Sequence, residues 1–261
     1  MKKMANKRRF AAILCLVLAG GLAGAALWLA PRLAVGRIRT NGITSYYVYS
    51  GPDADREEKL PTIIFVGHLL SSPFKDLATF KDRFDEPVLL IWSGLLRDLG
   101  ESCVVDDEAV WASKRELFPR LLDDYKAKLR VDESRIYLTG YSFAGVYAWM
   151  LAYDRPEWYA GVVPMSATSY PRQLQENLEA GKQVVTVWVR GEADDALPRD
   201  LAADTRTGRT IEADNPDSRF VLKAGEGHRD MHKYWRENLQ YVLQFDKRGR
   251  QRDDDESVNA E

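Results

Sequence analysis

Short, continuously apolar runs alternate with longer amphipathic segments along most of the chain. Strands buried on both faces of a sheet have such apolar runs, which occupy residues 61–67, 88–92, 161–165 and 184–189. Three more strands are predicted at residues 43–50, 135–139 and 220–223. Apolar residues at helical spacing predict a long helix over residues 106–130, with Pro119 a candidate kink, and shorter helices at 143–153 and 230–245 and within 71–84.

This alternation of strands and helices predicts the fold class. Continuously apolar strands separated by helices favour a mostly parallel central sheet covered by helices, which is an α/β fold. The chain of 261 residues is long enough for one such domain with a full core. No long insertion separates the helix at residues 143–153 from the last strand, so we expect no large lid domain.

The N-terminal segment has a different pattern. Five basic residues within residues 2–9 precede an uncharged apolar run over residues 10–30. Its length suits an uncleaved membrane-spanning signal anchor, while Ala23-Gly24-Ala25 resembles the cleavage site of a secretory signal peptide. Both interpretations place the large domain outside the cytoplasm. The predicted organisation is therefore a signal segment over residues 1–34, a globular domain over 35–246 and a charged, disordered tail over 247–261.

Composition excludes some classes of function. The formal net charge of −2 and the lack of a basic stripe argue against nucleic-acid binding. The two cysteines, Cys15 and Cys103, are too few and too far apart for a disulfide framework or a metal site. The sequence thus implies no metal and no cofactor.

One motif carries candidate chemistry. Gly140-Tyr141-Ser142-Phe143-Ala144-Gly145 is nearly a G-x-S-x-G motif and lies between a predicted strand and a predicted helix. A sharp strand-to-helix turn of this kind exposes a serine nucleophile above a sheet and needs small neighbours. A serine is a weak nucleophile, however, and requires a base and a group that orients the base. The competing interpretation is a structural serine in a tight turn.

Candidate partners follow Ser142 in the order acid, then histidine. Asp194 and Asp195 lie in the loop after the strand at 184–189, and His228 follows the strand at 220–223. Open α/β sheets place their sites at these carboxyl ends of strands. Of the two other histidines, His232 is interpreted as a surface or supporting residue on the last helix, and His68 follows the strand at 61–67.

The chain resembles α/β-hydrolases of the esterase and polyhydroxybutyrate-depolymerase-like type in residues 132–149, Pro156 and residues 159–166. The resemblance extends over about residues 61–241. It implies an α/β-hydrolase fold with Ser142 as nucleophile and His228 as base. The family's Gly-x-x-Asp-x-x-x-Pro loop falls on Gly191, Asp194 and Pro198, so the resemblance assigns the acid to Asp194 rather than Asp195.

The chain departs from this family at two points. Ala144 replaces the second motif glycine, and the usual His-Gly pair near the oxyanion is reversed to Gly67-His68, followed by leucines. One oxyanion donor is expected to be the N–H of Phe143, just after the nucleophile. The other is assigned to the N–H of Leu69, with His68 as the next candidate.

The leading functional hypothesis is a serine hydrolase of ester bonds that takes a small-molecule acyl-ester substrate. One alternative is a serine peptidase of the prolyl-oligopeptidase type. The other is a membrane-anchored, catalytically weak binding protein on a hydrolase fold, because a fold does not determine a function.

Overall fold

The computed structural model describes residues 35–52, 57–68, 71–81, 83–99, 107–196 and 200–247. The predicted signal segment, most of the predicted charged tail, Leu69 and Pro198 lie outside these residues, so the expectations for them stay predictions. Within the described ranges, no helix combines the length and the hydropathy needed to cross a membrane.

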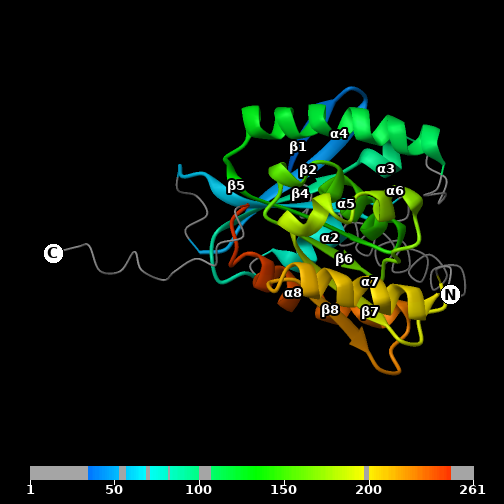
Figure 1. Ribbon diagram of the computed structural model, residues 1–261. Helices are drawn as coiled ribbons and strands as arrows, with labels where there is room; N and C mark the ends of the chain where they lie inside the picture. The colour runs from blue at the N-terminus through cyan, green and yellow to red at the C-terminus, as the bar shows by residue number, and fades with distance from the viewer. Residues whose placement is uncertain are drawn as a thin grey trace, which may run out of the picture. The chain divides into compact units, whose positions relative to one another are not determined.

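A single sheet of eight strands forms the centre of the described structure, in the order β1-β2-β4-β3-β5-β6-β7-β8 (Figure 1). The strands are β1 Gly36–Thr40, β2 Ile43–Ser50, β3 Leu60–Val66, β4 Val88–Ser93, β5 Val131–Tyr141, β6 Gly161–Met165, β7 Val185–Gly191 and β8 Arg219–Lys223. β2 runs antiparallel to β4, and every neighbouring pair from β4 to β8 is parallel. The predicted mostly parallel α/β sheet is therefore confirmed.

Helices connect these strands and cover the sheet. The α-helices are α2 Pro73–Phe80, α3 Leu95–Asp98, α4 Glu108–Lys128, α5 Phe143–Asp154, α6 Arg172–Glu176, α7 Leu201–Asp214 and α8 Trp235–Val242. Short 3-10 helices are η1 Pro156–Trp158, η2 Ala180–Gln183 and η3 His228–Tyr234. The long α4 begins at its N-cap Asp107, whose side chain accepts from the N–H groups of Ala109 and Val110, and it continues through Pro119.

Different helices cover the two faces of the sheet. Because side chains alternate along each strand, neighbouring residues contact helices on opposite faces. On one face, Ile64 and Leu138 share a core cluster with side chains of α4 and α5. On the other face, Phe65 packs against Phe80 of α2 and Trp235 of α8. Strands covered on both faces must be apolar throughout, which explains why β3, β4, β6 and β7 are buried at every position.

On the C-terminal side, one predicted helix needs correction and another helix was not predicted. The predicted last helix over residues 230–245 is instead η3 followed by α8, which ends at Val242. The sequence pattern also missed α7, because the residues that α7 buries are Asp204, Gly208 and Ile211 rather than an apolar stripe. A Cβ at Gly208 would lie 2.3 Å from the Phe220 ring, so α7 can approach β8 this closely only because Gly208 has no side chain.

A buried ion pair attaches α7 to the sheet. Arg190 of β7 and Asp204 of α7 are 1% and 2% exposed, and their side chains meet at 2.5 Å. Asp204 also accepts hydrogen bonds from the backbone N–H of Ser169 at 2.9 Å and from its hydroxyl at 2.7 Å. The pair therefore links β7, α7 and the loop that follows β6, close to the loop that carries Asp194.

Removing one partner of this pair should destabilise the domain strongly, because the other charge would remain buried without compensation. We expect Asp204→Ala to lower the free energy of unfolding by about 3–5 kcal/mol. The control is Asp214→Ala at the end of the same helix, where the carboxylate lies 3.6 Å from the ammonium of Lys182 and is partly exposed. That substitution should cost less than about 1 kcal/mol. Denaturant titration of both variants measures the difference, and equal losses would contradict this role of Asp204.

Candidate active site

Ser142 occupies a sharp turn between β5, which ends at Tyr141, and α5, which begins at Phe143. Its backbone has φ 60° and ψ −130°, in a region that residues with a Cβ rarely adopt. The N–H of Ser142 donates to the carbonyl of Met165 at 2.8 Å, which fixes the turn to β6. Strained backbone of this kind persists where the surroundings enforce it, commonly at functional sites.

Close backbone contact at this turn explains the pattern of small residues. A Cβ on Gly140 would lie 2.3 Å from the carbonyl oxygen of Ala144, and a Cβ on Gly145 would lie 2.8 Å from that of Gly140. Both positions therefore require glycine. Ala144, which replaces the second glycine of the familiar motif, is buried and accommodates its methyl group. The need for a missing side chain lies one residue later, at Gly145.

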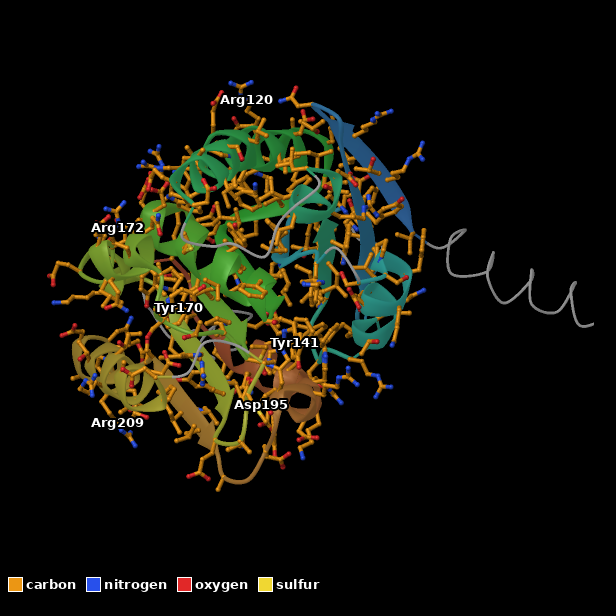
Figure 2. The ribbon with its side chains drawn as sticks, turned by 90° about the vertical axis from the view of Figure 1, so that its right-hand side faces the viewer. Arg120, Tyr141, Tyr170, Arg172, Asp195 and Arg209 are labelled. Atoms are coloured by element: carbon orange, nitrogen blue, oxygen red, sulfur yellow. The ribbon has the colours of Figure 1, made fainter. Side chains whose placement is uncertain are left out.

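Asp194 and His228 meet across the ends of β7 and β8. Nδ1 of His228 lies 2.7 Å from Oδ2 of Asp194, whose side chain is fully buried. The other carboxylate oxygen of Asp194 accepts from the N–H of Ala196 at 3.1 Å. Asp195, the adjacent carboxylate, is exposed at the surface (Figure 2). The structure thus brings His228 together with Asp194.

Electrostatics keep Asp194 ionised. Burial alone raises the pKa of this carboxyl group, because it disfavours the charged form. The hydrogen bond and the charge of His228 act in the opposite direction, with smaller contributions from the Ala196 N–H and Arg190. The result is a pKa below the usual value for an aspartic acid. Asp194 is therefore an acceptor that holds the proton of His228 on Nδ1 and leaves Nε2 to act as an acceptor.

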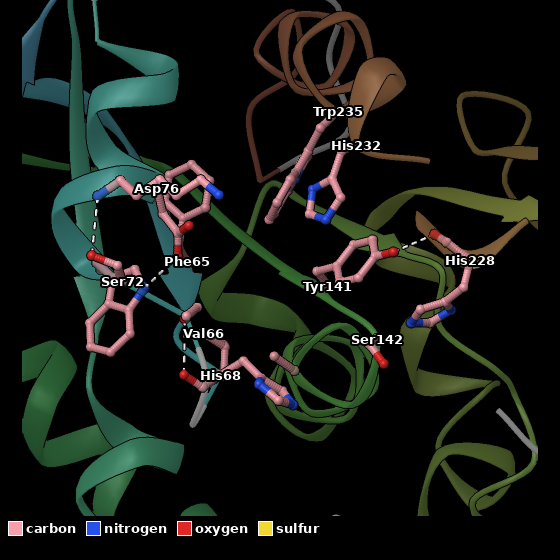
Figure 3. A pocket seen from close by; sticks show the side chains of 14 residues that line it. Phe65, Val66, His68, Ser72, Asp76, Tyr141, Ser142, His228, His232 and Trp235 are labelled. Atoms are coloured by element: carbon pink, nitrogen blue, oxygen red, sulfur yellow. Dashed lines mark hydrogen bonds between the residues drawn. The ribbon is translucent and has the colours of Figure 1, made fainter. Parts of the chain in front are cut away.

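The main chain of His228 is anchored as well as its side chain. Its carbonyl oxygen accepts a hydrogen bond from the hydroxyl of Tyr141 (Figure 3). The hydroxyl of Ser166, which follows β6, donates to the same oxygen at 3.1 Å. The sequence did not predict that either residue holds His228: Tyr141 was noted only as part of the serine motif, and no motif or spacing distinguishes Ser166 from an ordinary core residue.

Ser142 and His228 line one cavity of about 390 Å³. Aromatic side chains of Phe65 and Trp235 contribute to its wall (Figure 3). Trp92 also lines it. His232 also lines it and stacks on Tyr141 with the ring centroids 3.9 Å apart. His232, interpreted from the sequence as a surface or supporting residue, is exposed and also forms part of the cavity wall.

The expected oxyanion segment is described only in part. Phe143 is the first residue of α5, so its N–H belongs to the helix turn that has no acceptor within the helix. Gly67 donates its N–H to the carbonyl of Ser93 at 2.9 Å, and a Cβ there would collide with the Trp92 ring. The side chain of His68 lines the cavity. Leu69, the first choice for the other donor, lies outside the described residues.

The protonation state of His68 follows from its surroundings. Partial burial lowers the pKa of its imidazole, and the negative charge of Asp76 opposes this effect without cancelling it. The carboxylate of Asp76 itself accepts from the indole N–H of Trp92 at 3.0 Å. His68 therefore presents a neutral ring to the cavity near pH 7. Within the described residues, no group of His, Cys, Asp and Glu side chains has the arrangement of a metal site.

Comparison with known proteins assigns the fold. No protein-family profile and no curated protein sequence matches the chain. Among solved structures, Est1E from Butyrivibrio proteoclasticus is similar with a TM-score of 0.59 at 13% identity, covering 80% of this chain and 97% of its own. An S-formylglutathione hydrolase from Agrobacterium tumefaciens gives 0.59 at 12% identity, covering 83% and 95%. A putative dipeptidyl aminopeptidase IV from Bacteroides ovatus gives 0.59 at 14%, covering 81% of this chain but 35% of its own. The chain has the α/β-hydrolase fold.

The geometry of the strand-to-helix turn predicts different losses of stability for substitutions at neighbouring positions. Gly140→Ala should lower the free energy of unfolding by about 1–3 kcal/mol or more, because the new methyl group meets backbone that cannot move away. Ala144→Gly, which restores the familiar motif, should cost no more than about 1 kcal/mol, the difference in helix propensity. Thermal or denaturant unfolding compares the two. An Ala144→Gly loss as large as that of Gly140→Ala would refute the assignment of the close contact.

Proposed function

We propose that this protein is a serine hydrolase of carboxylic esters that acts through Ser142, His228 and Asp194. The observation that carries the proposal is geometric. A serine on a strained strand-to-helix turn shares a cavity with a histidine whose Nδ1 is hydrogen-bonded to a buried, ionised aspartate. These are the nucleophile, base and orienting group that acyl transfer to a serine requires.

The proposed reaction begins when Oγ of Ser142 attacks the ester carbonyl carbon. Nε2 of His228 accepts the hydroxyl proton, because Nδ1 is engaged by Asp194. The tetrahedral intermediate collapses as the imidazolium returns this proton to the leaving alcohol, which leaves an acyl group on Ser142. Water then attacks the acyl-enzyme with the same proton transfers and releases the acid. Asp194 remains a carboxylate and stabilises the imidazolium at each step.

Backbone amides are proposed to stabilise the oxyanion. The N–H of Phe143 is one donor, supported by its place in the first turn of α5, where the helix dipole also favours negative charge. For the other donor, Leu69 and His68 remain our candidates. The N–H of Gly67 is a poor candidate because it already donates to Ser93.

Peptidase activity is the second candidate function. The structural similarity to a putative dipeptidyl aminopeptidase IV favours it, but this chain corresponds to only 35% of that protein. The similarity to Est1E and to an S-formylglutathione hydrolase extends over 97% and 95% of those two proteins. We therefore favour ester over peptide substrates. Hydrolysis rates for p-nitrophenyl esters and aminoacyl p-nitroanilides separate the two.

Loss of the nucleophile or the base should abolish turnover. We expect Ser142→Ala and His228→Gln each to lower kcat for p-nitrophenyl acetate by at least about 10³-fold. The matched control is Ser113→Ala, which removes a partly buried serine hydroxyl that bonds the carbonyl of Val110 on α4. It should keep wild-type kcat. Turnover by folded Ser142→Ala would contradict the assignment, and no turnover by the wild-type protein would favour the binding-protein alternative.

The cavity predicts a preference for short acyl chains. A volume of about 390 Å³ lies at the low end of the range for small-molecule sites, so a long chain would extend beyond the wall. Across acetyl, butyryl, octanoyl and palmitoyl p-nitrophenyl esters, kcat/KM should fall at least roughly tenfold from the shorter pair to palmitoyl. Equal or higher kcat/KM for the palmitoyl ester would show that this cavity does not bind the acyl group.

A further inference from the structure

Two hydroxyl groups hold the main-chain carbonyl of His228, and they come from the side of the cavity that carries Ser142. Tyr141 immediately precedes Ser142 at the end of β5, and Ser166 follows β6, whose Met165 carbonyl accepts the N–H of Ser142. A carbonyl oxygen has two lone pairs, so two hydroxyl donors are all that this acceptor geometry favours. The main chain of His228 is thereby hydrogen-bonded to residues at the ends of the same two strands that hold Ser142.

Ser166 has an unusual backbone for a buried residue. It is fully buried, and its φ is 48°, in the left-handed region that residues with a Cβ avoid. Glycine would adopt this conformation without strain. A serine here keeps the strain and supplies the hydroxyl that bonds His228. Strain maintained at a buried polar residue points to a role beyond packing.

Tyr141 contacts the histidine segment through both its hydroxyl and its ring. Besides the bond to the His228 carbonyl, the ring lies with its centroid 5.0 Å from that of the His228 ring and stacks on His232, in the same 3-10 helix η3. Burial is the main reason why the pKa of the Tyr141 hydroxyl is raised to about 12, so the group remains a donor throughout the neutral and mildly alkaline range. The tyrosine thus bridges β5 and η3 with one hydrogen bond and with ring contacts to His228 and His232.

The other side of the histidine segment is tied to the loop of Asp194. The N–H of Ala193 donates to the carbonyl of Glu226 at 2.9 Å, and the N–H of Glu192 donates to that of Lys223 at the same distance. Gly225, at φ 70°, and Gly227 flank Glu226, so the approach to His228 has little intrinsic stiffness. Backbone bonds therefore tie the histidine segment to the loop of Asp194, and the two hydroxyls tie it to the strands that flank Ser142.

We propose that Tyr141 and Ser166 are positioning residues that hold His228 at the working distance from Ser142. The proposal rests on the proposed serine hydrolase function, because His228 matters as a base only there. A displacement of about 1 Å in a catalytic group is enough to cost on the order of 100-fold in rate. Neither residue needs to contact the substrate for this role.

The test uses the full-length protein with Tyr141→Phe, Ser166→Ala and Ser166→Gly. Each variant should lower kcat for p-nitrophenyl acetate and the rate of labelling by a fluorophosphonate by roughly 10- to 100-fold, with KM changed by less than about twofold. Ser166→Gly is the sharpest of the three. It removes the hydroxyl together with the backbone strain, so it should lose activity without a Tm below that of Ser166→Ala.

The matched control is Tyr241→Phe, which removes a partly buried tyrosine hydroxyl that bonds the carbonyl of Asp217 at 2.9 Å, away from the cavity. It should keep wild-type kcat. The positioning proposal is wrong, and the hydrolase function stands, if two results are found together. The wild-type protein is labelled and hydrolyses p-nitrophenyl acetate, and all three variants have the same kcat and labelling rate as Tyr241→Phe.

A second measurement reads the position of His228 without relying on turnover. We expect the Nδ1 proton of His228, hydrogen-bonded to Asp194, to give a downfield proton resonance, which its loss in His228→Gln would assign. We expect this resonance to broaden or shift in Tyr141→Phe and Ser166→Ala but not in Tyr241→Phe. If the wild-type protein neither labels nor turns over, the hydrolase function fails, and an unchanged resonance in all variants then also overturns the positioning role.

Discussion

The candidate site depends on one backbone contact, the close approach of β5 and α5 beside Ser142. With Gly140 and Gly145 facing each other's main chain, there is no room for a Cβ at either position. The chain can therefore reverse within a single residue, and Ser142 takes a positive φ to do so. This turn places the serine above the carboxyl ends of the parallel strands, where the loops after β7 and β8 bring Asp194 and His228. A larger residue at either glycine would separate the strand from the helix and move the serine away from its partners.

Strain and burial are distributed around this contact in a consistent way. Ser142 and Ser166 both have positive φ and follow adjacent parallel strands. The N–H of Ser142 donates to the carbonyl of Met165 on β6, and the hydroxyl of Ser166 donates to the carbonyl of His228. The buried Arg190–Asp204 pair stabilises the loop after β6 from the other side. Rigid surroundings keep such residues in unfavourable conformations, and the same rigidity gives a catalytic base a defined position.

Much of this architecture could be predicted from the sequence, because buried parallel strands have a strong apolar signature. The strands that carry Ser142, Asp194 and His228 were all expected, and so was the order in which the acid and then the histidine follow the serine along the chain. The close contact falls on Gly145 rather than on Ala144, and a sequence pattern does not reveal which carbonyl a Cβ would meet. α7 was missed because a salt bridge and a glycine, rather than an apolar stripe, attach it to the sheet. The positive φ of Ser166 has no local sequence signal, because serine rarely adopts it.

We propose that Ser142 becomes covalently acylated with the help of His228 and Asp194. The most direct test of this proposal is a rapid acid quench of the full-length protein during turnover of p-nitrophenyl butyrate, followed by mass spectrometry of the peptides. We expect a butyryl group on Ser142 in the peptide that spans the β5–α5 turn, and no such adduct in Ser142→Ala. Turnover without an adduct on Ser142, or an adduct on another residue that persists in Ser142→Ala, would contradict the proposal.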